Sequence, residues 1–378
     1  MVQSNKKVVI IRSNSIKTDS RVTKEVNTLL IAGYDIEIIG WNRDEDHTDN
    51  PNMYLTFGNT KIKVHLSDIP APMGAGKKNL LALVKFQKYI LETLNKIENV
   101  DIVHSCDFNT ATPALIYTKI KKIPLIYDIF DYFVDAYPVP DKLVPFIKKS
   151  ENAIVNQASA VLLVSEQYAD KIEGTHPKRT VVIRNTPNGT ATANKNTNIN
   201  SENLKFSFIG ALNDHRFIGE ALELFSKKPN WQITFGGYGS YVEKIKEFAE
   251  KHDNIKYLGS MPYDKVLEHE KNTDIMFAMY DPSLTNHKYS SPNKFYEAIM
   301  LGKPIIVAKG TGMDQDVIKY QIGEVAEYSI NGFETAVNHI LNTDLEALSN
   351  RANTLFNEQY SWKIMESRLL PLYKDLLN

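Results

Sequence analysis

The chain has 378 residues, of which 24% are charged and 43% hydrophobic, and its formal net charge is −1. This length favours two domains, and the balanced charge gives no reason to expect nucleic acid as a partner. The single cysteine, Cys106, excludes an intrachain disulfide and a cysteine-based metal cluster. No secretion signal and no apolar run near the roughly 18 residues of a spanning helix is present. We therefore expect a cytoplasmic protein, with contact to the inner face of the cytoplasmic membrane left open.

The first half begins with a β–α–β pattern. Residues 7–11 form an apolar run typical of a buried strand, residues 21–32 are amphipathic and end at Gly33, and residues 34–39 are again strand-like. Such a unit implies a parallel sheet with a right-handed crossover. Residues 42–60 suggest loop or irregular β structure. Further strands are predicted at 102–104, 124–128, 160–164 and 181–183, and helices at 77–97, 112–119 and 151–158.

A polar, Asn- and Thr-rich stretch at 187–203 predicts a linker between two domains. The second half then repeats the α/β pattern, with a helix at 217–226 and strands at 206–210, 231–235, 255–258, 274–278 and 305–308. A last helix at 361–378 follows the second sheet. We expect an N-terminal domain of residues 1–186 and a C-terminal domain of residues 204–360. In this architecture ligands bind at the carboxyl ends of the strands.

The stretch from Ser290 to Pro304 predicts a short helix with both ends marked. Ser290 or Ser291 can cap it, Pro292 suits its first position, Gly302 suits a left-handed end, and Pro304 stops continuation. Inside its apolar run stands one carboxylate, Glu297, which is costly to bury without a partner. Lys294 lies near the amino end, where helices bind phosphate. The pattern fits a nucleotide site, or equally a core helix whose Glu has a basic neighbour.

Other catalytic motifs are missing. No GxGxxG motif follows the first strand, and Gly237-Tyr238-Gly239 has no third glycine at the required spacing, which argues against a Rossmann dehydrogenase. The sequence has no HExxH, GxSxG or Cys/His pattern, and no convincing nucleophile–base pair.

Several segments together resemble a known family. They are "DSRVTKEVNTLLIAGYDIEIIGW", "DIVHSCDFNTATPAL" and "IPLIYDIFDYF" in the first half, and "FSFIGALNDHRFIGEALELF", "ITFGGYGSYVEKI", "NIKYLGSMPYDKVLEHEKNTDIMFAMY", "SPNKFYEAIMLGKPIIVA" and "YSWKIMESRLLPLYKDLL" in the second. Their order resembles the retaining, GT-B-fold glycosyltransferases of family 4 (glycosyltransferases group 1). The resemblance implies an α/β fold: two Rossmann-like domains with parallel sheets facing a central cleft, and a C-terminal helix crossing back to the N-terminal domain.

The resemblance also implies a donor site in the C-terminal domain. Glu297 matches the second glutamate of the family's paired motif, which binds the nucleotide ribose, whereas Tyr289 stands where the first would be. Ala211 replaces a usual Arg, and Arg216 matches the usual cationic ligand of the diphosphate. Lys294 is a second cation for it. Further donor contacts are expected from Gly210, Gly237, Tyr238, Gly239, Met261, Ser291 and Asn293.

The N-terminal domain departs further from the family's pattern. His104-Ser105-Cys106-Asp107 has Cys106 where a second His is frequent, and Phe130 stands in place of the His of the next strand end. Asp107 and Asp128 are candidate catalytic residues beside Arg216, Lys294 and Glu297. The acceptor-binding candidates are Asp19, Arg21, Asp128 and Asp131. The resemblance implies no cofactor and no required metal, because such enzymes hold the diphosphate with protein cations.

The expected activity is retaining transfer of a hexose from a nucleotide-diphosphate sugar, such as a UDP- or GDP-hexose, to a saccharide or lipid-linked saccharide. Cell-surface polysaccharide or glycoconjugate synthesis is the expected context, with peripheral membrane contact through lysines at 77, 78, 85, 88, 142, 148 and 149. Two alternatives remain open. One is a sugar-nucleotide 2-epimerase, and the other is a non-catalytic partner protein, which the departures at Tyr289, Ala211 and Cys106 motivate.

Overall fold

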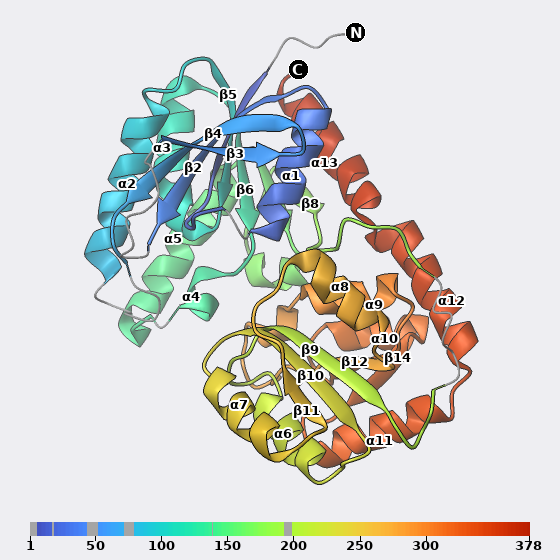
Figure 1. The fold of residues 1–378 in the computed structure, drawn as a ribbon. Coiled ribbons are helices and arrows are strands. Elements are labelled where there is room, and N and C mark those ends of the chain that lie inside the picture. The colour runs from blue at the N-terminus through green and yellow to red at the C-terminus, as the bar shows by residue number, and fades with distance from the viewer. Residues whose placement is uncertain (1–5, 17–18, 44–51, 72–78, 138, 193–198) are drawn as a thin grey trace. The chain divides into compact units, whose positions relative to one another are not determined.

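The computed structural model describes residues 6–16, 19–43, 52–71, 79–137, 139–192 and 199–378. The chain divides into two compact units (Figure 1). The first contains the chain up to Arg184 together with Met365–Asn378, and the second is Asn185–Ile364. The sequence placed these boundaries at 186 and 361. The predicted linker belongs to the second unit, where Thr192 N donates to Met300 O at 2.9 Å; its residues 193–198 lie outside the described part.

The first unit is built on a sheet in the order β3-β4-β2-β1-β5-β6-β7-β8. Its strands are β1 (Lys7–Ile11), β2 (Asp35–Asn42), β3 (Asn52–Phe57), β4 (Thr60–Asp68), β5 (Val100–Cys106), β6 (Leu125–Ile129), β7 (Ala160–Leu163) and β8 (Thr180–Val182). All pairings are parallel except β3 with β4. The expectation of irregular structure up to residue 60 was wrong for β3, because Gly58 turns with a φ of +56° and lets β3 pair back along β4.

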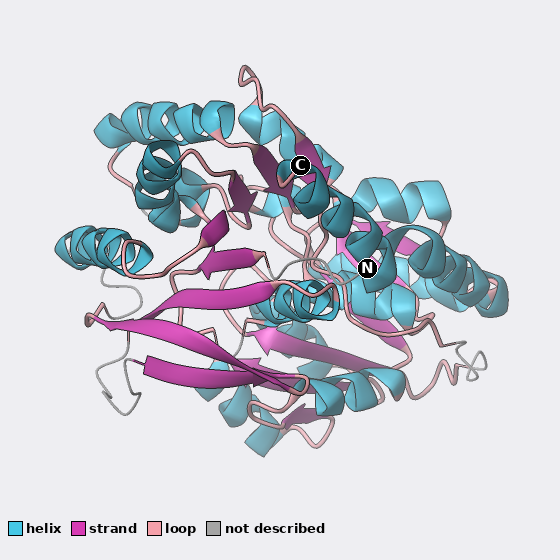
Figure 2. Ribbon diagram, turned by 90° about the horizontal axis from the view of Figure 1, so that it is seen from above, coloured by secondary structure: helices cyan, strands magenta, loops and turns pink. Residues whose placement is uncertain are grey.

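Helices cover both faces of this sheet (Figures 1 and 2). They are α1 (Ser20–Ile31), α2 (Leu80–Leu94), α3 (Phe108–Lys121), α4 (Phe133–Ala136), α5 (Val144–Gln157) and α13 (Trp362–Leu376), with short 3₁₀ turns at Asp141–Leu143 and Glu166–Ile172. The central strand β1 is apolar from Val8 to Ile11, and these residues are fully buried. This is the pattern of parallel strands that are covered on both faces.

The second unit contains a smaller parallel sheet in the order β11-β10-β9-β12-β13-β14. Its strands are β9 (Lys205–Ala211), β10 (Gln232–Tyr238), β11 (Ile255–Tyr257), β12 (Ile275–Ala278), β13 (Ile305–Ala308) and β14 (Gly323–Ala326). Its helices are α6 (Ile218–Ser226), α7 (Val242–Lys251), α8 (Tyr263–Lys271), α9 (Asn293–Met300), α10 (Met313–Tyr320), α11 (Ile330–Leu341) and α12 (Leu345–Leu355). Both units are Rossmann-like, so the predicted α/β fold class is confirmed.

The C-terminal helix α13 completes the core of the first unit. Thr28 Oγ1 of α1 donates to Glu366 at 2.9 Å, and the hydroxyl of Tyr373 lies 2.6 Å from His104 Nδ1 on β5. Leu369 and Leu372 are fully buried. Burying each such apolar side chain contributes about 1.5–3 kcal/mol. The predicted return of this helix to the N-terminal domain is therefore confirmed.

Replacing Tyr373 by Phe should lower the thermal midpoint of the first unit. The substitution leaves a buried ring nitrogen of His104 without its hydroxyl partner, which costs about 1–3 kcal/mol. Tyr54→Phe is the matched control, because Tyr54 is exposed on β3. Equal midpoints for the two variants in differential scanning calorimetry would contradict the role given to this contact.

Candidate active site

The strand order of the second unit indicates where a ligand would bind. Strands β10 and β11 lie on one side of β9 in the sheet, whereas β12, β13 and β14 lie on its other side. Ligands in open α/β sheets bind at the carboxyl ends of the strands where the order reverses in this way. That position lies between the segments that follow β9 and β12, and α9 begins near it.

Helix α9 carries the two central residues of the predicted donor site. It runs from Asn293 to Met300, and Gly302 takes the predicted left-handed conformation with a φ of +63°. The predicted serine cap was wrong. Pro292, in extended conformation, is the N-cap residue and no side chain caps the helix, while Ser291 Oγ instead pairs with the Tyr296 hydroxyl at 2.7 Å.

Lys294 is directed into the end of strand β9. It is only 6% exposed, and its Nζ donates to the carbonyl of Ile209 at 3.2 Å and lies 3.5 Å from the centroid of the Phe208 ring. Gly210, which follows Ile209, has a φ of +142° that favours glycine, and a Cβ built on it would lie 3.5 Å from this Nζ, in ordinary van der Waals contact. Burial and the nearby charge of Arg216 together lower the pKa of Lys294 to about 7, against the opposing effect of Glu297 and Glu270.

Glu297, one turn later on α9, is 3% exposed and pairs with two side chains of α8. The hydroxyl of Tyr263 and the carboxyl of Glu270 both form side-chain hydrogen bonds with it. Burial raises the pKa of Glu270 well above its usual range, and Glu297 raises it further. Glu270 was missed in the sequence, because α8 is a polar helix and nothing local distinguishes one of its glutamates from the others.

Arg216 stands in a loop whose backbone is held in an unusual conformation. Its neighbours His215 and Phe217 both have left-handed φ values, +61° and +62°. Each such residue costs of order 1–3 kcal/mol and persists only where its surroundings enforce it. Here the amide of Asp281 donates to His215 O at 3.0 Å, and Phe217 N donates to the Tyr328 hydroxyl at 2.9 Å. The guanidinium of Arg216 lies 5.1 Å from the centroid of the Tyr280 ring, just after β12.

The glycines of the predicted donor site have packing reasons of their own. Gly237 lies opposite Gly210 in the β9–β10 register, and a Cβ on it would lie 1.9 Å from Gly210 O. A Cβ on Gly239 would lie 2.3 Å from Leu212 O. Tyr238 between them is exposed, and the Sδ-methyl group of Met261 packs against Gly236. These close approaches bring the loop after β10 next to the end of β9.

The departures from the family's pattern also have places in the structure. Ala211 is the last residue of β9 and is half-buried. Tyr289 ends a short 3₁₀ turn, His287–Tyr289, just before α9. Asn293, at the start of α9, has a buried side-chain oxygen with no hydrogen-bond partner among the described residues. Such an oxygen is available to a ligand donor.

The first unit has its own reversal of strand order, between β1 and β5. Arg12 follows β1, Asp107 follows β5, and the two form an ion pair. Asp107 has φ and ψ of 63° and 164°, a region that is almost confined to glycine. Its carboxylate also accepts from the amide of Phe130 at 2.9 Å and from that of Asp131 at 3.3 Å. Burial raises the pKa of Asp107 to about 6, against the opposing effect of Arg12.

Arg12 was not identified from the sequence, although its place directly after a buried strand was a usable signal. Its guanidinium lies 4.0 Å from the centroid of the Phe130 ring, and that of Arg21 lies 4.6 Å from the same ring. An aromatic face attracts cations. A histidine in place of Phe130, as is frequent in the family, would lie next to the two guanidinium groups without offering them this phenyl face.

The predicted acceptor residues fall into two groups. Asp19 caps α1 by accepting from Val22 N at 3.1 Å, and it binds Arg12 Nε at 2.9 Å. Asp131 is exposed. Arg21 and Asp128 lie deeper, 2% and 0% exposed, with Nη2 and Oδ1 2.6 Å apart. Arg21 and Asp128 therefore bind each other in a buried ion pair.

Two further groups belong to this buried cluster. Glu25 of α1 lies with Oε1 3.2 Å from Arg21 Nε, and His104 Nε2 lies 3.4 Å from Asp128 Oδ2. Burial and the nearby Asp128 raise the pKa of Glu25 to about 7. In the described part of the chain, one set of residues has metal-ligand spacing: atoms of His104, Cys106 and Asp128 lie within 4.8 Å of one another. Arg21 already supplies a cation to Asp128, and burial holds the pKa of the Cys106 thiol well above its usual range, so the set fits a metal ion poorly.

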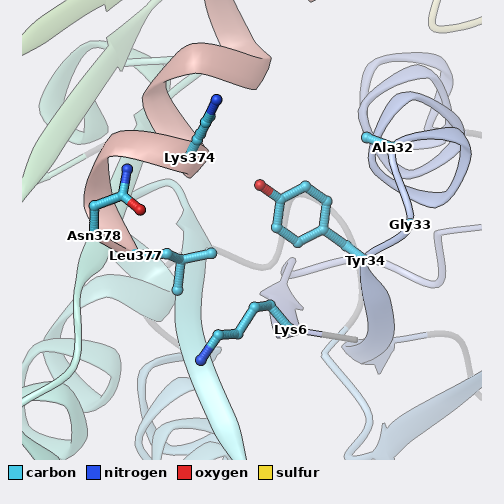
Figure 3. A pocket seen from close by; sticks show the side chains of 7 residues that line it. All are labelled: Lys6, Ala32, Gly33, Tyr34, Lys374, Leu377 and Asn378. Carbon is cyan, nitrogen blue, oxygen red and sulfur yellow. The ribbon is translucent and has the colours of Figure 1, made fainter. Parts of the chain in front are cut away.

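A pocket of about 190 Å³ in the first unit lies elsewhere. Its lining, shown in Figure 3, is Lys6, Ala32, Gly33, Tyr34, Lys374, Leu377 and Asn378. Lys6 precedes β1 and Tyr34 precedes β2, so this pocket is at the amino ends of the strands. It is therefore separate from the site at the carboxyl ends.

Comparisons with known proteins agree with this geometry. Residues 21–188 match the family described as Glycosyltransferase Family 4, and residues 190–354 match Glycosyl transferases group 1. A search of curated protein sequences found no match. The two consecutive matches identify the chain as a glycosyltransferase of the group 1 and family 4 type, so the recognised family and the predicted enzyme class are confirmed.

Solved structures share the GT-B fold at low sequence identity. Sucrose-phosphate synthase from Thermosynechococcus elongatus aligns with a TM-score of 0.77 and 14% identity, over 98% of this chain and 99% of that one. HepE from Anabaena in complex with UDP-glucose gives 0.68 and 11%, over 98% and 99%. A glycosyltransferase from Rickettsia africae gives 0.66 and 16%, over 100% of both chains.

Replacing Glu25 by Gln should stabilise the protein more at pH 8 than at pH 5. The pKa of Glu25 is raised in the folded state from an ordinary 4.5 to about 7. The native protein therefore holds a proton that the unfolded chain releases in this window, and stability falls as the pH rises through it. The variant lacks this fall, so its gain over the parent should grow by about 1–3 kcal/mol between pH 5 and 8. Glu92→Gln, at an exposed position of α2, is the control in urea unfolding; the same difference at both pH values would contradict the assignment.

Proposed function

We propose that the chain is a retaining hexosyltransferase that uses a nucleotide-diphosphate sugar as donor. The observation that carries the proposal is the pair Lys294 and Glu297, one turn apart on α9 and both buried where the strand order of the second unit reverses. A cation and an anion so placed match the diphosphate and the ribose of one nucleotide. The similarity to HepE, which was solved with UDP-glucose, supports a UDP-hexose; a GDP-hexose is the other donor to test.

In the proposed reaction the bond between the anomeric carbon and the β-phosphate oxygen breaks, and a bond from the acceptor hydroxyl oxygen forms on the same face. The acceptor proton passes to the departing diphosphate, so no side-chain nucleophile is needed. Arg216 and Lys294 stabilise the negative charge that develops on the leaving group. Because an anion favours the charged form of a nearby amine, donor binding should raise the low pKa of Lys294 and keep it protonated.

The remaining predicted residues take supporting roles in this proposal. Around the nucleotide we place Gly210, Gly237, Tyr238, Gly239, Met261, Ser291 and Asn293. In the first unit, Asp107 and Asp131 follow β5 and β6 and are proposed to contact the acceptor sugar. Asp19, Arg21 and Asp128 hold that segment through Arg12, Phe130 and each other. The reaction as proposed requires neither a cofactor nor a metal ion.

We further propose a saccharide or lipid-linked acceptor in cell-surface polysaccharide or glycoconjugate synthesis, at the cytoplasmic face of the membrane. No helix in the described residues is long and apolar enough to cross a bilayer, so the proposed contact is peripheral. Around the start of α5, Phe146 is 70% exposed and Leu143 50%, with Lys142, Lys148 and Lys149 also exposed beside them. Apolar side chains flanked by lysines suit the surface of anionic lipid. Lys77 and Lys78 lie outside the described residues.

Replacing Glu297 by Ala should weaken UDP binding at least tenfold in isothermal titration calorimetry, because the ribose hydroxyls lose a buried charged acceptor. Glu268→Ala serves as control, since Glu268 is exposed on α8 and pairs with Lys265 of the same helix. Unchanged UDP affinity in the Glu297 variant would remove this donor assignment.

A thermal-shift panel of UDP-, GDP- and ADP-sugars should reveal one stabilising donor, since a ligand that binds only the native state raises the melting temperature. Proton NMR of the product should then show the donor's anomeric configuration. Incubation with UDP-GlcNAc alone tests the epimerase alternative, because formation of the 2-epimer without acceptor would favour that reaction over transfer.

The double variant Leu143→Ser, Phe146→Ser should reduce binding to phosphatidylglycerol-containing vesicles about tenfold or more, because burial of each apolar side chain contributes about 1.5–3 kcal/mol. Ile31→Ser is the matched control, since Ile31 is exposed on α1. Equal cosedimentation of both variants with the vesicles would contradict membrane contact at α5.

A further inference from the structure

Helix α8 directs two of its side chains at Glu297 of the proposed donor site. Tyr263 begins the helix and Glu270 lies seven residues later, a spacing of two helical turns that puts both on one face. The rest of the helix is largely solvated: Glu268, His269 and Lys271, the nearest charged neighbours of Glu270, are exposed. Glu270 itself is 1% exposed. A buried carboxyl group on an otherwise solvated helix needs a physical reason.

The charges around Glu270 supply that reason. From α9 it faces Glu297, its hydrogen-bond partner, and the cation of Lys294; Tyr263 faces the same site from its own helix. Arg216 acts on Lys294 from the loop after β9. Two carboxyl groups that touch and share one buried cation cannot both be ionised at low cost. The protonated carboxyl group then donates a hydrogen bond to the ionised one. Oε2 of Glu270 has no hydrogen-bond partner among the described residues.

We propose that Glu270 is a positioning residue of the donor site: its carboxyl group donates a hydrogen bond to Glu297 and fixes the orientation in which Glu297 accepts from the nucleotide ribose. The proposal rests on the proposed function of Glu297. It assigns a second carboxyl group to this site, contributed by α8, in a chain that has Tyr289 where a paired glutamate would stand eight residues before Glu297. Tyr263 supplies a second donor to the same carboxylate.

The decisive experiment measures UDP affinity of the full-length protein by calorimetry for four variants. Glu270→Gln keeps a donor at this position and should bind UDP within about threefold of the parent. Glu270→Leu has no donor and should bind at least tenfold more weakly. Glu268→Gln and Glu268→Leu, two residues earlier on the same helix and exposed, should leave the affinity unchanged.

A pH series from 6.5 to 9.5 separates positioning from mere packing. As Glu270 ionises with rising pH it stops donating, so the parent should lose UDP affinity more steeply than Glu270→Gln, whose amide donates at every pH. Deprotonation of Lys294 weakens binding in both proteins, and it comes earlier in Glu270→Gln because Glu270 raises the pKa of Lys294 in the parent, so Lys294 cannot produce the steeper loss expected of the parent. Parallel pH profiles would overturn the proposal, and this arm remains available if Glu270→Leu fails to fold.

A double variant distinguishes the failure of this proposal from that of the donor site itself. If Glu270 acts through Glu297, then Glu270→Leu should weaken UDP binding in the parent and have little further effect in Glu297→Ala. An equal loss in both backgrounds would overturn the positioning role, as would parent-like affinity in Glu270→Leu beside weak binding by Glu297→Ala. Parent-like affinity in Glu297→Ala would instead overturn the proposed donor site.

Discussion

The second unit depends on the burial of one amine, that of Lys294, beside two carboxyl groups. Removing an ammonium group from water is costly, and here the cost is offset by the carbonyl of Ile209, the ring of Phe208 and the charge of Glu297. Helix α8 contributes Tyr263 and Glu270, whose side chains both interact with Glu297. Strand β9, helix α8 and helix α9 are thus tied together by the same few atoms that the proposed donor would contact.

The first unit contains a similar balance of charge at its own reversal of strand order. Arg21 lies between Asp128 and Glu25, and Glu25 is the acid whose pKa burial raises. In each unit, then, one cation is buried with two carboxyl groups, and burial raises the pKa of one of these acids. Removing the cation or the ionised acid would leave an uncompensated buried charge, which costs far more than the net contribution of the intact set.

The sequence predicted the features that local chemistry determines. Gly302 and Pro304 mark the end of α9, and the apolar runs mark the central strands of both sheets. It failed where packing between distant elements decides. Glu270 meets Glu297 only because α8 packs against α9, and Arg12 meets Phe130 across two strand ends. The sequence also does not tell whether a side chain points inward: Arg21 and Asp128 were predicted as acceptor-binding residues and lie in a buried ion pair.

Cys106 is the only cysteine in the sequence, and its thiol is fully buried at the end of β5. Its raised pKa disfavours the reactive thiolate, so a thiol reagent can modify it only after this part of the sheet opens. Cys106 is therefore a natural probe for the opening of the first unit. The rate of labelling reports the opening of the first unit alone and needs no engineered probe.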